Sequence, residues 1–162
     1  MIRIRASLAG DLPFVTELER HPDNRELIGQ WTDDEHRAGI EGRERWTHWI
    51  VEQDGRQAGF IISRDCREQG AGIYMKRILV RDKDRGIGQA ALKAFLDRSR
   101  DLYATSDIWL IVRRENLRAQ AVYRKLGFEP FEPQGDAARN YDEVAEPPAD
   151  RAFRMRLAAG FS

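Results

Sequence analysis

The chain has little of what defines several common classes of protein. It contains one cysteine, Cys66, which excludes an intramolecular disulfide and a cysteine-rich zinc site. Its three histidines, His21, His36 and His48, show none of the spacings typical of metal ligands, so no metal is expected. No stretch approaches the roughly 18 apolar residues of a membrane span, and the first residues lack the apolar run of a signal peptide. No membrane partner is expected, and the expected location is the reducing cytoplasm.

An excess of charge of either sign is also absent. Twenty-seven basic side chains face 27 acidic ones, which gives a formal net charge of zero and a pI near 6.9. A nucleic-acid-binding domain normally carries a clear positive excess, so no nucleic-acid partner is expected. Only four of the 27 basic residues are lysine. This bias toward arginine suits contacts with carboxylate and phosphate groups, but it is equally a mark of genome composition.

The length of 162 residues corresponds to about one domain. It is enough chain to build a hydrophobic core, but too little for two Rossmann halves or for a (β/α)₈ barrel of about 250 residues. Hydrophobic residues make up 41% and charged residues 33%, as in a well-solvated globular protein. Neither internal repeats nor a linker are visible, so we expect residues 1–162 to form a single domain.

Hydrophobic periodicity predicts an α/β (α+β) fold with a mixed sheet. Helices are expected to begin near Asp11, at Thr32, after Gly88 and at Asn116, each with a capping or first-turn signal. Asp54-Gly55 predicts a tight hairpin, because this pair tolerates positive φ. The expected strands are residues 2–5, 45–52, 57–63, 73–80, 108–112, a short strand from Phe128, and residues 152–157. Residues 132–150 are expected to form a polar loop between the last two strands.

The most informative stretch lies between residues 76 and 100. A strand ends, a charged turn follows, and Gly86-Ile87-Gly88 opens a helix. Glycines allow close approach of a ligand to the backbone, and a helix N-terminus presents unpaired N–H groups and a positive dipole end. The combination predicts a phosphate site, most naturally for a pyrophosphate. The plain alternative is a helix that begins with glycines and binds nothing.

Two other phosphate-binding motifs fit this stretch poorly. The run from Gly86 to Ala91 satisfies a loose Rossmann pattern, but five charged residues separate Val80 from Gly86. The acid about 20 residues further on, Asp107, precedes the next strand, whereas a ribose-binding acid follows one. A P-loop is excluded because no Gly-Lys-Ser/Thr follows. A nucleotide-dependent oxidoreductase is therefore disfavoured.

A second stretch, residues 116–128, carries the pattern Asn-x-x-Ala-x-x-x-Tyr-x-x-x-Gly-Phe after an apolar strand. Together with the run from Lys83 to Gly88, it closely resembles the GNAT superfamily of N-acetyltransferases. The superfamily's loop is Gln/Arg-x-x-Gly-x-Gly/Ala, and Lys83 departs from its first position. The resemblance covers residues 73–128. More weakly, residues 1–72 resemble the ribosomal-protein-acetyltransferase branch.

The resemblance implies a seven-stranded, mostly antiparallel sheet with about four helices and splayed central strands that form a cleft. The cosubstrate would be acetyl-CoA, and the partner would be a primary amine on a small molecule or a peptide N-terminus. The strand before the loop would bind pantetheine, and the loop would bind the pyrophosphate. The implied cofactor-binding residues are Leu79, Val80, Arg85, Gly86, Ile87, Gly88, Gln89, Ala90 and Asn116.

Tyr123 is the implied catalytic residue, because its hydroxyl would reach the sulfur and protonate the leaving thiolate. Backbone N–H groups near Leu79 or Val80 would stabilise a developing oxyanion, and the orientation of two bound reactants would supply most of the acceleration. Each residue also has a structural alternative. Tyr123 is equally suited to packing, and Asn116 to helix capping. Arg85 is equally suited to a solvated surface position.

The general base is the main departure from the superfamily. Some members carry a Glu on the strand before the Asn motif, and Ile111 occupies that place here. The base is then elsewhere, or water-mediated, or the amine arrives deprotonated. The remaining candidates, which are equally ordinary surface groups, are Glu26, Asp33, Asp34, Glu35 and His48.

Two polar segments, residues 23–42 and 132–150, would enclose the acceptor. Their apolar anchors include Leu27, Ile28 and Trp31, and their carboxylates favour a cation with an apolar stem, such as a polyamine, an aminoglycoside or a peptide N-terminus. Both are alternatively plain solvated loops. The residues expected near the acceptor are Trp31 and Tyr141 with Asp23, Glu26, Asp33, Asp34, Glu35, Asp136, Asp142, Glu143 and Glu146.

The rival function is a non-catalytic acyl-CoA-binding module that regulates a partner. Such a module would keep residues 83–90 but would not need Tyr123, so Tyr123 favours the enzyme. We also expect the hairpin and the last strand to expose a sheet edge. Many members of the superfamily pair as homodimers, so a homodimer is a further expectation.

Overall fold

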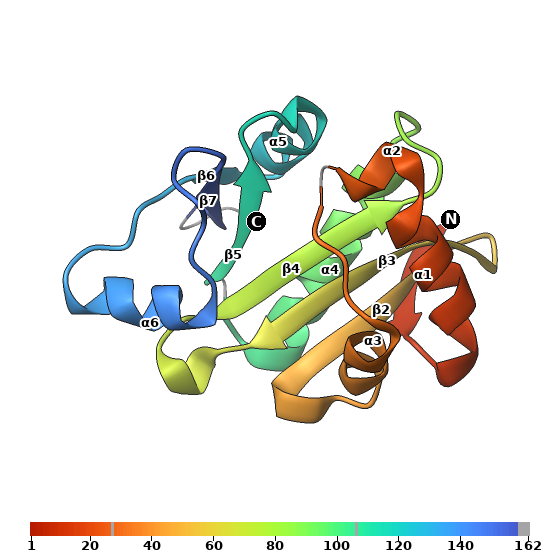
Figure 1. The fold of residues 1–162 in the computed structure, drawn as a ribbon, viewed down its shortest axis with the longest axis horizontal. Helices are drawn as coiled ribbons and strands as arrows, with labels where there is room; N and C mark the ends of the chain where they lie inside the picture. Colours follow the sequence, from red (N-terminus) through yellow and green to blue (C-terminus); the bar gives the residue numbers. More distant parts are fainter. Residues whose placement is uncertain (27, 106, 159–162) are drawn as a thin grey trace.

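The structure is a computed structural model that describes residues 1–26, 28–105 and 107–158. Leu27 and residues 159–162 lie outside this part, so the expectations that touch them stay predictions. Seven strands form one sheet in the order β1-β2-β3-β4-β5-β7-β6 (Figure 1). The strands are β1 (Ile2–Ala6), β2 (Trp46–Gln53), β3 (Arg56–Asp65), β4 (Ile73–Val80), β5 (Ile108–Arg113), β6 (Phe128–Pro130) and β7 (Ala152–Leu157).

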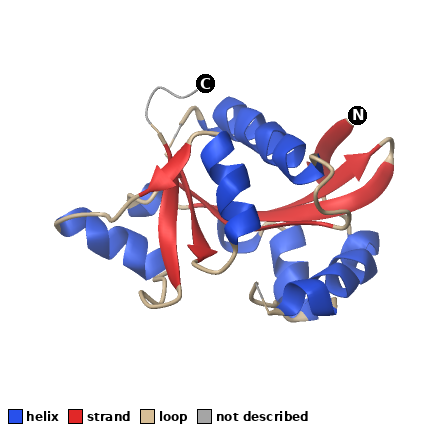
Figure 2. Cartoon of the chain, turned by 90° about the horizontal axis from the view of Figure 1, so that it is seen from above, coloured by secondary structure: helices blue, strands red, loops and turns tan. Residues whose placement is uncertain are grey.

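Every strand pair is antiparallel except β4 with β5, which is parallel. Helices cover both faces of the sheet (Figure 2). One face carries α1, α3 and α6, and the other carries α4 and α5 (Figure 1). The α-helices of the described residues are α1 (Leu12–Arg20), α2 (Pro22–Arg25), α3 (Asp33–Ile40), α4 (Ile87–Tyr103), α5 (Leu117–Lys125) and α6 (Asp136–Val144).

Most of the local signals in the sequence are confirmed. Asp54 and Gly55 form a two-residue hairpin turn with φ of 51° and 81°. Thr32 and Glu35 form a reciprocal capping box at the start of α3. Asn116 accepts the N–H of Ala119 and caps α5, and Gly127 follows that helix with φ of 94°. Each of these signals acts within one turn of chain, where tertiary packing has little influence.

Three expectations about the fold are wrong. Residues 136–144 of the expected loop form α6, because Tyr141 packs edge-on to the buried Trp109, with ring centroids 5.1 Å apart. The helices therefore outnumber the expected four. The hairpin and the last strand do not lie at a sheet edge, since β7 pairs with both β5 and β6 and the edges are β1 and β6. Asp11 precedes α1, but its side chain bonds to no N–H of that helix and instead accepts from the Leu8 main chain and pairs with Arg5.

A helix that crosses a membrane must be both long and apolar. Within residues 1–26, 28–105 and 107–158, none of the helices has the length and apolar character needed to cross a bilayer.

Candidate active site

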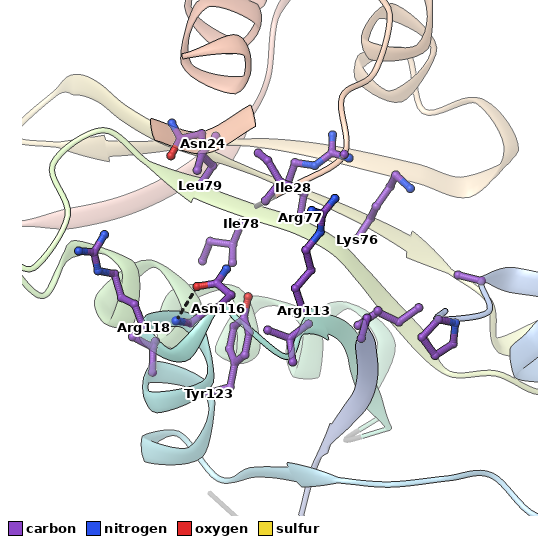
Figure 3. A pocket seen from close by; sticks show the side chains of 18 of the residues that line it. Asn24, Ile28, Lys76, Arg77, Ile78, Leu79, Arg113, Asn116, Arg118 and Tyr123 are labelled. Atoms are coloured by element: carbon purple, nitrogen blue, oxygen red, sulfur yellow. Dashed lines mark hydrogen bonds between the residues drawn. The ribbon is translucent and has the colours of Figure 1, made fainter. Parts of the chain in front are cut away.

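A cleft opens where the two parallel strands separate. β4 and β5 pair only at Ile73 with Ile108 and at Tyr74 with Trp109, and beyond these pairs they diverge. A cavity of about 480 Å³ lies between the diverging halves and the helices beside them (Figure 3). The expected splay of the central strands is thereby confirmed.

A β-bulge in β4 lies beside the start of this cleft. Arg77 pairs with Ile62 of β3 and Met75 pairs with Ser63, so Lys76 has no partner between them. A bulge bends the strand and interrupts the alternation of side chains. Met75 packs in the core on the α4 face, whereas Lys76 lies over Trp31 and Arg77 contacts Glu19 of α1. Two consecutive basic side chains therefore lie on the same face of β4.

The N-terminus of α4 borders the cleft. Gly86 precedes it with φ of 75°, a left-handed conformation that strains other residues. The N–H groups of the first helical turn have no helical partner, whereas Ala90 already donates its N–H to Gly86. Gly88 lines the cavity, and a Cβ built there would meet only a Val80 methyl at 3.9 Å. The helix end thus offers N–H donors and space for the close approach of an anion.

Basic side chains surround this helix end. A second cavity of about 420 Å³ shares Asn24, Lys83 and Arg118 with the cleft. Lys83 donates to the Val80 carbonyl at 3.2 Å, and Arg118 pairs with Asp84 at 2.9 Å. The charged residues that line this second cavity are two acidic ones, Asp23 and Asp82, and four basic ones, Arg81, Lys83, Arg85 and Arg118. Together with the helix N-terminus, they form an electropositive mouth suited to several phosphates.

Asn116 and Tyr123 face the cleft from α5 (Figure 3). Asn116 caps the helix through its carbonyl oxygen, which leaves its amide N–H₂ available to a ligand. The Tyr123 side chain packs on Phe128 and is 8% exposed, and burial raises its pKa. The hydroxyl hydrogen-bonds to none of the described residues, so it remains a neutral donor at the cleft.

The structure brings some predicted residues to the cleft and leaves others aside. Leu79, Val80, Gly88, Asn116 and Tyr123 line the main cavity, and Arg85 lines the smaller one. The predicted residues that line neither cavity are Gly86, Ile87, Gln89 and Ala90, of which Ile87 is buried in the core. Gly86, Ile87 and Gln89, at the start of α4, would act through their backbone N–H groups only, whereas the N–H of Ala90 is already bonded to the Gly86 carbonyl.

The backbone of β4 also faces the cleft. Along an antiparallel pair, successive residues direct their N–H and C=O groups alternately toward and away from the partner strand. Arg81 donates its N–H to Ala58 of β3, so Val80 directs its own groups away from β3. The same alternation assigns Ile78 to the open side, a residue that sequence reasoning missed. The alternation along β4 would have indicated Ile78, but only once the pairing of β4 with β3 was known.

None of the proposed general bases reaches the cleft, and each has another partner. Asp33 pairs with Arg20, Asp34 with Arg37, and Glu35 closes its capping box. The Glu26 main chain accepts from Arg113, and its carboxylate does not line the cavity. His48 is 3% exposed and hydrogen-bonds to Ser7 and His36. Ile111 lines the cleft where the Glu of some relatives was expected.

The two acceptor segments do border the cleft, but mostly without their carboxylates. Asn24, Ile28 and Gly29 contribute from the first segment, and residues 145–148 from the second. Among the described residues, Glu146 is the one carboxylate that lines the main cavity. Trp31 and Tyr141 are 9% and 7% exposed and belong to the core. The expected acidic lining of the main cavity is therefore wrong. Of the other carboxylates, Asp23 lines the smaller cavity, Glu26 lines neither, and the rest belong to α3 and α6 and line neither.

Basic residues that sequence reasoning did not select line the cleft instead. They are Lys76 and Arg77 of β4 and Arg113 of β5 (Figure 3). The scarcity of lysine was a weak signal for Lys76. The bulge that turns both β4 residues to one face depends on the register with β3, which no local pattern reveals.

Residues 12–128 match the sequence model of the Acetyltransferase (GNAT) family. The chain belongs to this family. The spermidine N(1)-acetyltransferase of Escherichia coli K12 is 23% identical over 137 residues, which cover 78% of this chain and 72% of that protein. The [ribosomal protein bS18]-alanine N-acetyltransferase of the same strain is 28% identical over 98 residues, 60% of this chain and 62% of that protein.

Solved structures of GNAT enzymes share the fold. An aminoglycoside acetyltransferase, AAC(6')-Ib, in complex with coenzyme A matches with a TM-score of 0.79 at 17% identity and covers 98% of this chain and 95% of that one. The family confirms the expected reaction class, an acetyl-CoA-dependent N-acetyltransferase acting on an amine. The alternative of a non-catalytic acyl-CoA-binding module is not favoured.

Proposed function

We propose that this GNAT enzyme binds acetyl-CoA along β4, with the phosphates at the α4 N-terminus and the thioester beside Tyr123. One observation carries this proposal. The gap between β4 and β5 runs from the electropositive helix end, past Asn116 and Tyr123, to the part of the cleft beside Lys76. A long, thin molecule with phosphates at one end fits this arrangement.

Backbone groups and cationic side chains would bind different parts of acetyl-CoA. The free N–H groups at the start of α4 and the side chains of Lys83, Arg85 and Arg118 would bind the phosphates. The open edge of β4 at Ile78 and Val80 would hydrogen-bond the amide-rich pantetheine arm as an added strand would. Lys83 would then exchange its bond to the Val80 carbonyl for a phosphate oxygen.

The chemistry needs a donor for the leaving sulfur and a neutral amine. Tyr123 supplies the donor, because burial raises its pKa and keeps its hydroxyl protonated. The amine nitrogen bonds to the thioester carbonyl carbon, the carbon–sulfur bond breaks, and the Tyr123 proton passes to the sulfur. Since Ile111 faces the cleft in place of a carboxylate, the proton of the amine passes to water, and water returns a proton to the Tyr123 oxygen. Orientation of the two reactants in one narrow cleft supplies most of the rate.

Two measurements test this function. Isothermal titration with CoA should give saturable binding, and acetyl-CoA with a panel of primary amines should give thiol release that depends on the amine. CoA stabilises the fold if it binds only the folded state, so melting should shift upward as CoA is added. CoA binding without amine-dependent thiol release under any condition would contradict the catalytic proposal and favour the binding module.

Location and assembly are proposed separately. A cytoplasmic location is supported by Cys66, a free and fully buried thiol whose pKa burial raises to about 11.

A homodimer would form through β1, since the other edge, β6, is short and ends at Pro130, which lacks a donor. Sedimentation equilibrium at micromolar protein would show the dimer, and a monomer there would contradict it.

A further inference from the structure

The charge of the cleft differs from that of the loops around it. Among the described residues that line the main cavity, six are basic and one, Glu146, is acidic. The basic residues are Lys76, Arg77, Lys83, Arg113, Arg118 and Arg151. The chain as a whole has zero formal net charge, so this excess is local. A cleft built to accept a polycation would place carboxylates at these positions.

Five of these six basic residues, all except Arg151, fall into two groups on either side of Tyr123. Lys83 and Arg118 also line the smaller cavity beside α4, where the phosphates of the donor are proposed to bind. Lys76, Arg77 and Arg113 do not line that cavity. In Figure 3, Asn116 and Tyr123 lie between Arg118 on one side and Lys76 and Arg113 on the other. The second group therefore lies beyond the reacting centre, where the acceptor must enter.

Lys76 is the residue whose charge is least compensated. It forms no ion pair with the described residues, and its Nζ lies over the ring of Trp31, 5.9 Å from the ring centroid. Burial, and then the charge of Arg77, lower its pKa, while the charges of Glu35 and Glu19 oppose this without outweighing it. A half-buried ammonium without a carboxylate is costly, and an anion bound beside it would relieve that cost.

The two arginines differ in what they can still bind. Arg77 donates to the buried carboxylate of Glu19 at 2.5 Å, which fixes its guanidinium and balances its charge. Arg113 reaches across the cleft and donates to the main-chain carbonyl of Glu26, a neutral group. Its nearest carboxylate, Glu115, is 3.8 Å away and exposed. Arg113 thus keeps donors and positive charge for an incoming anion.

From this geometry we propose that the acceptor is a small amine that carries a carboxylate, bound by Lys76 and Arg113, with its amino group directed toward Tyr123. The proposal rests on the proposed acetyl transfer and specifies its substrate class as amino acids or similar amino-carboxylates. Arg77, whose charge is balanced by Glu19, holds this end of the cleft in place and does not itself bind the acceptor. Polyamines and aminoglycosides, which carry only positive charge, are disfavoured by the same groups.

Matched acceptors test the charge of the substrate directly. Amino acids, their carboxamides and diamines of equal chain length are compared as acceptors at saturating acetyl-CoA. The carboxylates should give a kcat/KM at least about tenfold above the carboxamides, the size expected from one charge-assisted contact. Diamines acetylated faster than amino acids would overturn the proposal while leaving the acetyltransferase function intact.

Variants of Lys76 separate substrate binding from other roles. Lys76→Met should raise KM for the carboxylates about tenfold and leave KM for the carboxamides unchanged. Arg113→Met should act in the same direction. Lys93→Met and Arg139→Met remove exposed charges far from the cleft and should change neither. If Lys76 were instead the general base, kcat would fall for every acceptor alike, and that result would refute the proposal.

A binding experiment decides the matter even if turnover is not observed. The complex with CoA is titrated calorimetrically with an N-acetylated amino acid and with the corresponding carboxamide, which are the reaction products of the two acceptors. Tighter binding of the carboxylate, lost in Lys76→Met, would support the proposal. Equal binding, or none by the carboxylate, would refute it. Failure of CoA itself to bind would refute the proposed donor site instead.

Discussion

Arg77 on β4 donates a 2.5 Å hydrogen bond to Glu19 on α1, in a pair that is 5% and 0% exposed. The other carboxylate oxygen of Glu19 accepts from the Trp31 main chain at 2.9 Å and contacts His36 at 3.0 Å. Desolvation would raise the pKa of Glu19, but these partners outweigh it and hold the pKa below its usual range. The pair joins α1 to the strand that forms one side of the cleft.

The first prediction concerns the stability that this pair contributes. Glu19→Gln should destabilise the fold by about 3–5 kcal/mol, because it leaves the Arg77 guanidinium buried without a counter-charge. The double variant Glu19→Gln with Arg77→Met should recover part of the loss, since no unpaired charge remains. Urea unfolding at pH 7 measures both. A double variant less stable than the single one would show that the charge of Arg77 is not the cause.

The second prediction tests the donor loop. Gly88→Val should fold, because Gly88 has no left-handed φ and its Cβ would meet only Val80 at van der Waals distance. The added side chain lies where the phosphates approach the backbone, so CoA affinity should fall by at least about a hundredfold, roughly 2.7 kcal/mol. Calorimetry with CoA measures this.

Gly10 provides the matched control for this change, since a Cβ there also has open space and lies far from the cleft. Gly10→Val should leave CoA affinity unchanged. An unaltered affinity in a folded Gly88→Val variant would contradict the assignment of the phosphate site.

The third prediction isolates the hydroxyl of Tyr123. Tyr123→Phe keeps the ring against Phe128 and removes only the proton donor. Kcat should fall by about 10²–10⁴-fold if protonation of the thiolate limits the rate, while CoA affinity stays nearly constant. Tyr103→Phe, on α4 and outside the cleft, serves as the control. Turnover of Tyr123→Phe at the parent rate across the pH range would exclude the role.

The fourth prediction is a loss of stability in mild acid caused by His48. Burial first, and then the charge of His36, lower the pKa of His48 from 6.5 to about 3. Below about pH 6.5, His48 is protonated in the unfolded chain but stays neutral in the folded protein. The free energy of unfolding therefore falls as the pH falls. The slope for one proton is about 1.4 kcal/mol per pH unit.

Urea unfolding between pH 7 and 4.5 measures this slope. The range lies above about pH 4.3, the ordinary carboxyl pKa at which the unfolded chain takes up protons on Asp11 and Glu19. The folded pKa values of both are lower still, so those carboxylates contribute little to the slope. His48→Asn should flatten the slope by one proton even if it lowers the stability at pH 7. An unchanged slope in that variant would assign the acid sensitivity to another group.

Several features of the site follow from the sequence alone because they are local. Gly86 and Gly88 at the start of a helix, Asn116 at an N-cap and Asp54-Gly55 in a turn each act through bonds within a few residues. Such interactions depend little on the rest of the fold. The glycine loop and the pattern that begins at Asn116 also carried the resemblance to the GNAT family, and the implied residues Leu79, Val80 and Tyr123 do line the cleft.

Tertiary structure decided the character of the acceptor side. Lys76 and Arg77 lie on one face only because β4 bulges against β3, and Arg77 is fixed by a carboxylate 58 residues earlier in the chain. The carboxylates of α3 and α6 look like a lining in sequence, yet they pair or cap elsewhere. Register and helix docking come from contacts between distant segments, which the periodicity of one segment does not specify. The sequence by itself therefore determined the family and the glycine loop before α4, whereas only packing decided the charge of the side chains that line the cleft.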